Sequence, residues 1–382
     1  MAACGPRMTR PLVICVINEA WFFRSHFLPW ARAAVAEGFE VVVVAAPGDA
    51  ECEIAAASIG FVASRATRRG LLPRGLWPAA RQVARLVDPA RPTIIHAFGL
   101  HGMVIAALAR LMERPAATVV SVTGLGFLAS GTGAGRVMAA AVAKGLVRSL
   151  DGPSTIWLAE NADDAAALGL DTGRAAGRLV RLTGAGVDLA AFDPQPLPPG
   201  PPLRLVMVAR MIRSKGVDLA VAALTLARTR GIDATLSIVG APDAGNPRSY
   251  GTDELAAFAA APGVRMLGAR HDIPALLAAA HAFVLPSRGG EGLPKALLEA
   301  AAAGRPAIVT DVPGCRDFVR PGETGWVVPA GDVEALASAI AAAASADLAA
   351  TGSAARAAAE ASAGIATIAA GVVAAYRRAM AG

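Results

Sequence analysis

Short apolar segments alternate with helix-like segments along most of the chain. The apolar segments are rich in β-branched residues and have few polar positions, a pattern typical of strands that are buried on both faces. In the first half we expect strands at Leu12–Ile17, Val41–Ala45, Thr93–His96, Thr118–Val122, Ile156–Leu158 and Leu179–Leu182. In the second half we expect strands at Leu203–Val208, Ala234–Val239, Val264–Leu267, Ala282–Leu285, Ala307–Thr310 and Trp326–Val328. Between the strands we expect helices, among them Phe27–Glu37, His101–Met112, Gly135–Ser149 and Asn161–Leu168. This alternation predicts an α/β protein with two doubly wound, Rossmann-like parallel sheets.

A proline-rich segment, residues 194–202, separates the two halves. Proline has no backbone N–H, so this segment fits neither a helix nor a central strand, and we expect a stiff linker. The prediction is a Rossmann-like domain over 1–193, the linker, and a second Rossmann-like domain over 203–352. A helical segment over 353–382 follows and could pack back on the first domain. Ligands of such folds bind outside the carboxyl ends of the strands, so we expect the domains to face a central cleft that holds the site.

The composition excludes several classes of protein. Of 382 residues, 54% are hydrophobic and 17% are charged, which rules out global disorder. The longest apolar helical stretch, Gly364–Tyr376, is shorter than the roughly 20 residues that span a membrane. Pro11–Ile17 fits a first strand better than a signal peptide. The four cysteines have no metal-site spacing and are expected to be reduced thiols. We therefore expect a cytoplasmic protein.

Positive charge is concentrated in one part of the chain. The net charge is +6, but Ile54–Met112 holds eight arginines against Asp88 alone, a net +7. If the segment is helical, Arg74, Arg81 and Arg85 share one face, and a basic amphipathic element of this kind is typical of an anchor at an anionic membrane surface. The apolar neighbours that would support it are Leu72, Leu76, Val83 and Leu86. An ordinary solvated helix face is the alternative. Aromatic residues are only 5% and do not interleave with the arginines, so nucleic acid is not an expected partner.

A glycine-rich turn follows the strand predicted at Ala282–Leu285. The helix after it is expected to begin near Pro294, because proline is tolerated in a first helical turn. The backbone N–H groups of Gly292 and Leu293 would then lie at a helix N-terminus, which suits a diphosphate. A glycine turn that only caps the helix is the alternative.

Charged side chains accompany this turn. Glu291 lies in the loop, and Glu299 lies more than one turn inside the helix, where a carboxylate could bind paired sugar hydroxyls. Arg210 and Lys215 follow the first strand of the second domain, at the same sheet edge. Two cations at an anion site would stabilise a diphosphate leaving group. A surface loop with ordinary charges is the alternative.

The first domain offers two histidines: His26 follows the first predicted strand, beside a possible helix start, and His96 ends the third. A buried structural role is the alternative for His96. The glycines Gly124, Gly126, Gly131 and Gly133 do not complete a dinucleotide fingerprint, and no acidic residue follows at the distance that a nucleotide-binding fold requires. Known metalloprotease, hydrolase and P-loop motifs are also missing from the sequence. We expect neither a cofactor nor a metal.

Taken in order, these segments resemble the family 4 glycosyltransferases of the GT-B fold. The motifs that carry the resemblance in the second domain are Arg210-x4-Lys215-Gly216, Glu291-Gly-Leu-Pro with Glu299 after it at E-x7-E spacing, Ala303-Gly-Arg-Pro306 and Thr310-Asp-Val-Pro-Gly314. In the first domain they are Phe22-Phe-Arg-Ser-His26, Gly38, His96-Ala-Phe98, Val122-Thr-Gly-Leu-Gly-Phe127 and Gly184-Ala-Gly-Val-Asp188.

The resemblance implies a metal-independent, retaining transfer of a sugar from a nucleotide donor, for which we expect a UDP-linked sugar. By this resemblance the second domain binds the donor and the first binds the acceptor. Arg210 and Lys215 would hold the diphosphate with Gly292, Leu293 and Pro294, Glu299 would hold the ribose, and Arg270 would lie near the nucleobase. Glu291 would face the donor sugar, and His26 is the second catalytic candidate.

One position departs from the family. Many members have a histidine where this chain has Thr123, which puts a histidine-assisted acceptor step at this position in doubt. The Thr-Gly-Leu-Gly-Phe form looks like a bacterial branch that elongates polyprenyl-diphosphate-linked sugars at the cytoplasmic membrane face. Thr123, Gly124 and His96 are therefore the acceptor-side candidates. A nucleotide-sugar epimerase on the same fold and a non-catalytic nucleotide-sugar or lipid-binding protein remain the alternatives.

Overall fold

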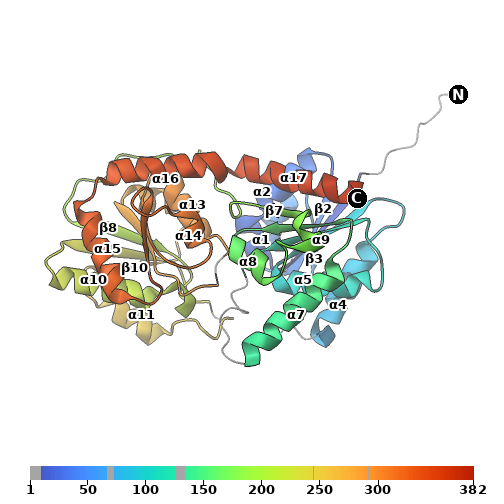
Figure 1. Cartoon of the computed structure of the whole chain (residues 1–382), viewed down its shortest axis with the longest axis horizontal. Coiled ribbons are helices and arrows are strands. Elements are labelled where there is room, and N and C mark those ends of the chain that lie inside the picture. The colour runs from blue at the N-terminus through green and yellow to red at the C-terminus, as the bar shows by residue number, and fades with distance from the viewer. Residues whose placement is uncertain (1–9, 67–72, 125–133, 244, 291) are drawn as a thin grey trace. The chain divides into compact units, whose positions relative to one another are not determined.

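The computed structural model describes residues 10–66, 73–124, 134–243, 245–290 and 292–382. The chain divides into two compact units (Figure 1). Unit 1 comprises Met1–Ala185 together with Ala366–Gly382, and unit 2 comprises Gly186–Ile365. Each unit is a parallel sheet with helices on both faces, which confirms the predicted fold class.

Unit 1 is built on a seven-stranded sheet of order β3-β2-β1-β4-β5-β6-β7. Its strands are β1 (Leu12–Glu19), β2 (Glu40–Ala46), β3 (Gly60–Ala63), β4 (Thr93–Phe98), β5 (Ala117–Val122), β6 (Thr155–Ala159) and β7 (Leu179–Arg181). Every strand pair is parallel. The sequence did not predict β3, a short edge strand whose residues all remain partly or fully exposed.

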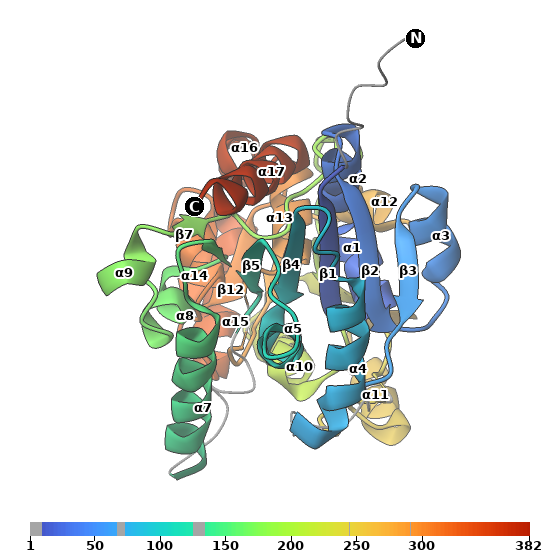
Figure 2. The ribbon, with the colours of Figure 1, turned by 90° about the vertical axis from the view of Figure 1, so that its right-hand side faces the viewer.

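Alternate residues of the strands in unit 1 lie in two separate apolar cores, one on each face of the sheet. In β1, Val13 and Cys15 face one core while Ile14 and Val16 face the other. The first core packs on α1 (Ala20–His26), α2 (Leu28–Ala36) and α17 (Ile365–Ala381). The second packs on α4 (Pro73–Leu86), α5 (Gly99–Arg110) and α7 (Ala134–Leu150), which lie together on one side of the strands in Figure 2. The shorter helices of this unit are α3 (Glu51–Ala56), α8 (Ala162–Ala167) and α9 (Gly173–Ala176).

The last helix of the chain belongs to unit 1. In α17, Val372, Val373 and Tyr376 are buried in the first core of this unit. The hydroxyl of Tyr376 and Nδ1 of His96 in β4 share a hydrogen bond of 2.7 Å. The C-terminal helix therefore completes the sheet face formed by the N-terminal part of the chain.

Unit 2 has a six-stranded sheet of order β10-β9-β8-β11-β12-β13. Its strands are β8 (Leu203–Val208), β9 (Ala234–Val239), β10 (Val264–Gly268), β11 (Ala282–Leu285), β12 (Ala307–Thr310) and β13 (Gly325–Val328). Its helices are α10 (Val217–Thr229), α11 (Thr252–Ala259), α12 (Ile273–Ala278), α13 (Lys295–Ala302), α14 (Cys315–Phe318), α15 (Val333–Ser345) and α16 (Leu348–Ser362). One continuous apolar core joins the strands to these helices.

The proline-rich segment is part of unit 2, which corrects the predicted linker over 194–202 and the boundary at 193. The chain passes between the units at Ala185–Gly186 and again at Ile365–Ala366. The carbonyls of Gln195 and Pro196 accept hydrogen bonds from the buried guanidinium of Arg305. The Pro198 carbonyl accepts another from Nε2 of His281, whose Nδ1 accepts the backbone N–H of Arg204. Long-range donors of this kind hold a segment that has few backbone donors of its own. The predicted boundary between the second domain and the C-terminal helical segment, at residue 353, also differs from the structure, because this residue lies inside α16.

No single helix in the described part of the chain has both the length and the apolar character needed to cross a bilayer. Only α15 and α16 taken together meet that requirement, and they are bent by 108° at the residues that join them.

Candidate functional site

The predicted donor residues gather where the order of strands in unit 2 reverses. β8 lies beside β11, so the loops that follow these two strands leave the sheet next to each other. In open parallel sheets this reversal is the usual place for a ligand, outside the carboxyl ends of the strands. Arg210 and Lys215 follow β8, and the glycine-rich turn follows β11.

The turn after β11 needs its glycines. Gly289 and Gly290 have φ of 109° and 82°, a region that other residues rarely adopt. Pro294 caps α13 with φ of −61°, so the helix begins at Lys295, close to the predicted start. Gly292, Leu293 and Pro294 are all buried. Glu291, predicted to face the donor sugar, lies outside the described residues.

Across this turn lies Gly314, with φ of 80°. A Cβ on Gly314 would come within 1.6 Å of the Gly292 carbonyl oxygen, so no side chain fits there. The close approach fixes the backbone at the start of α13, where the amides of a diphosphate site are expected.

Lys215 ends a single 3-10 turn, Arg213–Lys215, that packs directly on the loop after β11. Gly216 follows in the left-handed region with φ of 71°, and a Cβ there would lie 2.0 Å from the Pro286 carbonyl oxygen. The backbone N–H of Arg288 donates to the Ser214 carbonyl over 2.7 Å. The structure thus brings the Lys215 turn and the glycine-rich loop together.

Arg210 extends from the end of β8 and is half exposed. Its guanidinium donates to the Asp243 carboxylate over 2.8 Å, so part of its charge is already balanced. A diphosphate at this edge would compete with Asp243 for the same guanidinium.

Glu299 lies on α13 one turn after Lys295, and its side chain is 12% exposed. Burial raises the pKa of the Glu299 carboxyl, and the Lys295 ammonium 3.3 Å away acts in the opposite direction. A carboxylate that is mostly sheltered from water is suited to accept hydrogen bonds from sugar hydroxyls.

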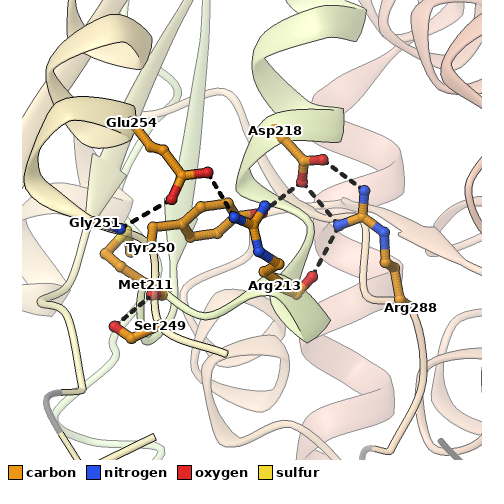
Figure 3. A network of polar contacts seen from close by, with 8 residues as sticks. All are labelled: Met211, Arg213, Asp218, Ser249, Tyr250, Gly251, Glu254 and Arg288. Atoms are coloured by element: carbon orange, nitrogen blue, oxygen red, sulfur yellow. Dashed lines mark hydrogen bonds and ion pairs between the residues drawn. The ribbon is translucent and has the colours of Figure 1, made fainter. Parts of the chain in front are cut away.

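Sequence reasoning missed a polar network that surrounds the Lys215 turn (Figure 3). Arg288 contacts both oxygens of Asp218 with its two terminal nitrogens, at 2.8 and 2.6 Å. The Tyr250 hydroxyl donates to Asp218 over 2.6 Å. Arg213 lies over the Tyr250 ring, 5.0 Å from its centre, and donates to Glu254 over 2.7 Å. Arg288 stands in the glycine-rich segment of the sequence, but its partner Asp218 can be identified only from the fold.

The network changes the acid–base behaviour of its members. Burial acts to raise the pKa of the Asp218 carboxyl, but hydrogen bonds from Arg288 and Tyr250 outweigh burial and hold the pKa below its usual value. Burial and the hydrogen bond to Asp218 raise the pKa of Tyr250 to about 12. Asp218 is therefore a carboxylate and Tyr250 a neutral phenol at neutral pH.

Arg270 follows β10, the edge strand, which is separated from β8 by β9. Its guanidinium makes two hydrogen bonds to Asp272, at 2.8 and 2.6 Å. The structure places Arg270 at the periphery of the sheet edge rather than beside Lys215.

In unit 1 the predicted acceptor residues follow β1 and β5, on either side of the strand reversal between β1 and β4. His26 ends α1, with its Nδ1 2.5 Å from the Ser25 hydroxyl and its ring 4.3 Å from that of Phe22. Gly124 has φ of 104°. A Cβ on Gly99 would lie 3.3 Å from the Thr123 hydroxyl, so the first residue of α5 meets the loop after β5 there.

His96 is a core residue, and its predicted acceptor-side role is wrong. The strand predicted to end at His96 continues to Phe98, which places the imidazole inside the sheet, fully buried. Nδ1 shares a hydrogen bond with Tyr376, and Nε2 shares one of 2.8 Å with Ser121. Burial lowers the pKa of His96 to about 3. Both ring nitrogens are used within the core.

The predicted basic face lies on α4, which begins at Pro73 and contains Pro78 within it. Arg74, Arg81 and Arg85 are exposed, and Arg81 lies over the Trp77 ring, 5.9 Å from its centre. The apolar partners expected to enter a membrane are instead turned inward: Leu76 and Val83 are fully buried in unit 1, and Leu86 is partly buried against the same core. Leu72 lies outside the described residues.

Within the described ranges, no three His, Cys, Asp or Glu side chains lie close enough together to hold a metal ion.

Each unit matches a known family of domains. Residues 202–346 match the description "Glycosyl transferases group 1", and residues 13–150 match "Glycosyl transferase 4-like". The matches fall in unit 2 and unit 1 respectively.

Curated relatives align over shorter stretches. A putative colanic acid biosynthesis glycosyltransferase of Escherichia coli is 34% identical over 170 residues, which is 41% of this chain and 40% of the relative. An N,N'-diacetylbacillosaminyl-diphospho-undecaprenol α-1,3-N-acetylgalactosaminyltransferase of Campylobacter jejuni is 36% identical over 115 residues, 30% of this chain and 28% of the relative. The chain thus spans less than half the length of these relatives.

Among solved structures, the Anabaena protein HepE, crystallised with UDP and glucose, matches with a TM-score of 0.75 and 19% identity. The match covers 95% of this chain and 98% of HepE, and at this identity it concerns the fold. With one family match in each unit, these relatives and the shared fold, the chain belongs to the family 4 glycosyltransferases, which have the GT-B fold.

Proposed function

We propose that the chain is a retaining glycosyltransferase that transfers a sugar from a UDP-linked donor to a polyprenyl-diphosphate-linked sugar or another glycan acceptor. The observation that carries the donor side is the packing of the Lys215 turn against the glycine-rich loop at the strand reversal of unit 2. HepE, which was crystallised with UDP and glucose, supports the choice of nucleotide.

The proposed chemistry begins with departure of the nucleotide. The bond between the anomeric carbon and the diphosphate oxygen breaks, and Arg210, Lys215 and the amides of Gly292 and Leu293 stabilise the developing negative charge. The sugar becomes oxocarbenium-like. The acceptor hydroxyl oxygen bonds to the anomeric carbon from the face that the nucleotide leaves, so the configuration is retained. Its proton passes to the departing diphosphate, which balances the reaction.

We assign the remaining donor roles to residues of unit 2. Glu299 accepts hydrogen bonds from the ribose hydroxyls, for which its sheltered carboxylate is suited. Pro294 shapes the start of α13, and Arg270 lies toward the nucleobase. Glu291 is the catalytic candidate beside the donor sugar.

In unit 1, His26 is the catalytic candidate on the acceptor side, and Thr123 and Gly124 are the acceptor contacts. Their positions after β1 and β5 flank the strand reversal of this sheet. A metal ion has no role in the proposed reaction, because Arg210 and Lys215 supply the positive charge at the leaving group.

We also propose that the acceptor is reached at the cytoplasmic face of a membrane. The Campylobacter relative is named for an undecaprenol-linked substrate, and the exposed arginines of α4 suit an anionic surface. Because the apolar face of α4 is buried, the contact rests on Arg74, Arg81, Arg85 and Trp77, which is 37% exposed. Electrostatic attraction, rather than insertion of the helix, would provide the binding.

The proposal is tested in two steps. A panel of nucleotide sugars is first screened for thermal stabilisation, because a ligand at a hundred times its Kd raises stability by about 2.7 kcal/mol. The stabilising donor is then incubated with and without a lipid-linked sugar, and free nucleoside diphosphate is measured. A glycosyltransferase releases it only when the acceptor is present. An epimerase converts the donor without acceptor, and a binding protein releases nothing. Either of these last results would overturn the proposal.

A further inference from the structure

We propose that Arg288 is a positioning residue that holds the Lys215 turn in place for the donor diphosphate, with Asp218 and Tyr250 as its support. The inference rests on the proposed function of Lys215. It concerns a residue outside the motifs that point to the family, since Arg288 precedes the Glu291-Gly-Leu-Pro motif.

Arg288 contacts the turn at two successive carbonyl groups. Its backbone N–H donates to the Ser214 carbonyl over 2.7 Å, and its side-chain Nη1 donates to the Arg213 carbonyl over 2.8 Å. Ser287 adds a third contact from its hydroxyl to the Ser214 carbonyl at 3.2 Å. The two residues that precede Lys215 are therefore held from the loop after β11.

The guanidinium of Arg288 is itself fixed. Asp218, at the start of α10, takes two hydrogen bonds from it, a geometry that Arg provides and Lys cannot. The Tyr250 hydroxyl donates to the same Asp218 oxygen as Nη1 of Arg288 (Figure 3). α10 begins just after the Lys215 turn. The Asp218–Arg288 pair therefore links the segment that follows the turn to the glycine-rich loop.

The other end of the turn is held from the loop before α11. The Met211 carbonyl accepts the Tyr250 backbone N–H at 3.0 Å and the Ser249 hydroxyl at 3.2 Å. The backbone N–H of Arg213 donates to the Arg248 carbonyl over 2.9 Å. Tyr250 thus contributes both to this anchor and to the support of Arg288.

These contacts leave Lys215 little freedom in its backbone. Its own N–H bonds to the Ile212 carbonyl, and Gly216 packs against Pro286 without room for a Cβ. A lysine side chain has much rotamer freedom, and a fixed backbone limits the positions that its ammonium group can reach. Loss of the Arg288 side chain removes one of the two hydrogen bonds to the Arg213 carbonyl, which keeps the one from the Gly216 N–H, and leaves the Asp218 carboxylate without its guanidinium.

The test compares Arg288→Gln and Arg288→Lys with the parent full-length chain. Hydrogen exchange of the Lys215 and Gly216 amides, measured without ligand, should be at least about tenfold faster in Arg288→Gln. Titration with UDP should show about a tenfold weaker Kd in the same variant. Arg288→Lys keeps the charge but not the paired hydrogen bonds to Asp218. Its amide exchange rates and its Kd for UDP should lie between those of the parent and those of Arg288→Gln. The matched control is Arg320→Gln, which removes a surface arginine that pairs with Glu323 in the same unit.

A double-variant cycle separates positioning from general destabilisation. If Arg288 acts through Lys215, Arg288→Gln should weaken UDP binding by less than about twofold in a Lys215→Ala background. Full additivity would overturn the proposal, and so would unchanged exchange of the two amides in Arg288→Gln. If the parent binds no nucleotide at all, the proposed function fails, while the exchange rates still decide whether Arg288 orders the turn.

Discussion

In the proposed reaction, Lys215 supplies a positive charge at the leaving group. Its backbone is held between the loop after β11 and the loop before α11. We expect Lys215→Ala to lower the turnover number by about a hundredfold, since electrostatic stabilisation of this kind is worth roughly 3 kcal/mol. The measurement is nucleotide release at saturating donor and acceptor. Lys144→Ala, an exposed lysine on α7, is the control, and turnover within threefold of the parent in Lys215→Ala would refute the assignment.

His96 shows how a candidate site residue becomes a stability determinant. In the unfolded chain its pKa is near 6.5, whereas in the core its pKa is about 3. Between these values the unfolded state binds a proton that the folded state does not, so the free energy of unfolding falls as pH drops from 6.5 toward 3. The loss is about 1.4 kcal/mol per pH unit.

We therefore expect His96→Gln to be less stable than the parent at pH 7.5 but to lose less stability between pH 6.5 and 4.5. Urea unfolding followed by tryptophan fluorescence at both pH values measures the difference. His271→Gln, at an exposed position, should retain the slope of the parent. An identical slope in His96→Gln and the parent would show that this buried imidazole is not the group that titrates.

At the scale of secondary-structure elements, the sequence predicted the buried central strands better than the exposed edge strand and the short helix after β1. β8, β9, β11 and β12 begin and end where the apolar runs do, because buried parallel strands are bounded by polar or turn residues. β3 was missed because an exposed edge strand lacks that pattern, and α1 was missed because it follows β1 without a break.

Contacts between distant segments explain the remaining differences. The backbone of Pro194–Pro202 is anchored by Arg305 and His281, which lie about 80 to 110 residues further along the chain. Arg288 likewise finds Asp218 across 70 residues. The donor motifs could be located from local sequence, but partners at such separations emerge only when the sheet order is known.

α4 is the element whose exposed charges can be tested as a group. Each basic residue near an anionic surface contributes about 1 kcal/mol, so changing Arg74, Arg81 and Arg85 together to Gln should weaken vesicle binding by about a hundredfold. Co-sedimentation with anionic vesicles measures this change. UDP binding should be unaffected, because the donor residues belong to unit 2.

High salt should reproduce the effect of this triple variant in the parent chain, because the Debye length shrinks to about 3 Å at 1 M. Vesicle binding equal to that of the parent would mean that α4 presents only a solvated face. Loss of UDP binding as well would show that the arginines support the fold.

For the whole molecule, the charge arrangement predicts how activity responds to chelation. Arg210 and Lys215 supply positive charge at the proposed leaving group, and the described residues include no cluster of three metal-ligand side chains. We expect nucleotide release to continue unchanged in excess EDTA. Complete loss of activity that added Mg²⁺ restores would refute the metal-independent reaction.

The burial of α17 in unit 1 sets the order in which the chain can fold on the ribosome. Unit 2 is contiguous, Gly186–Ile365, and can fold as soon as it emerges, whereas unit 1 lacks Tyr376 and its neighbours until residues 366–382 have been synthesised. The usual order of folding, in which the N-terminal domain folds first, is therefore reversed. At a synthesis rate of about 5–20 residues per second, one face of the unit 1 sheet stays uncovered for roughly 10–40 s before α17 is made. During this time chaperones can bind the exposed face. Nascent chains arrested after residue 365 should accordingly yield a protease-resistant unit 2 and a digestible unit 1, and resistance of both would show that unit 1 folds without α17.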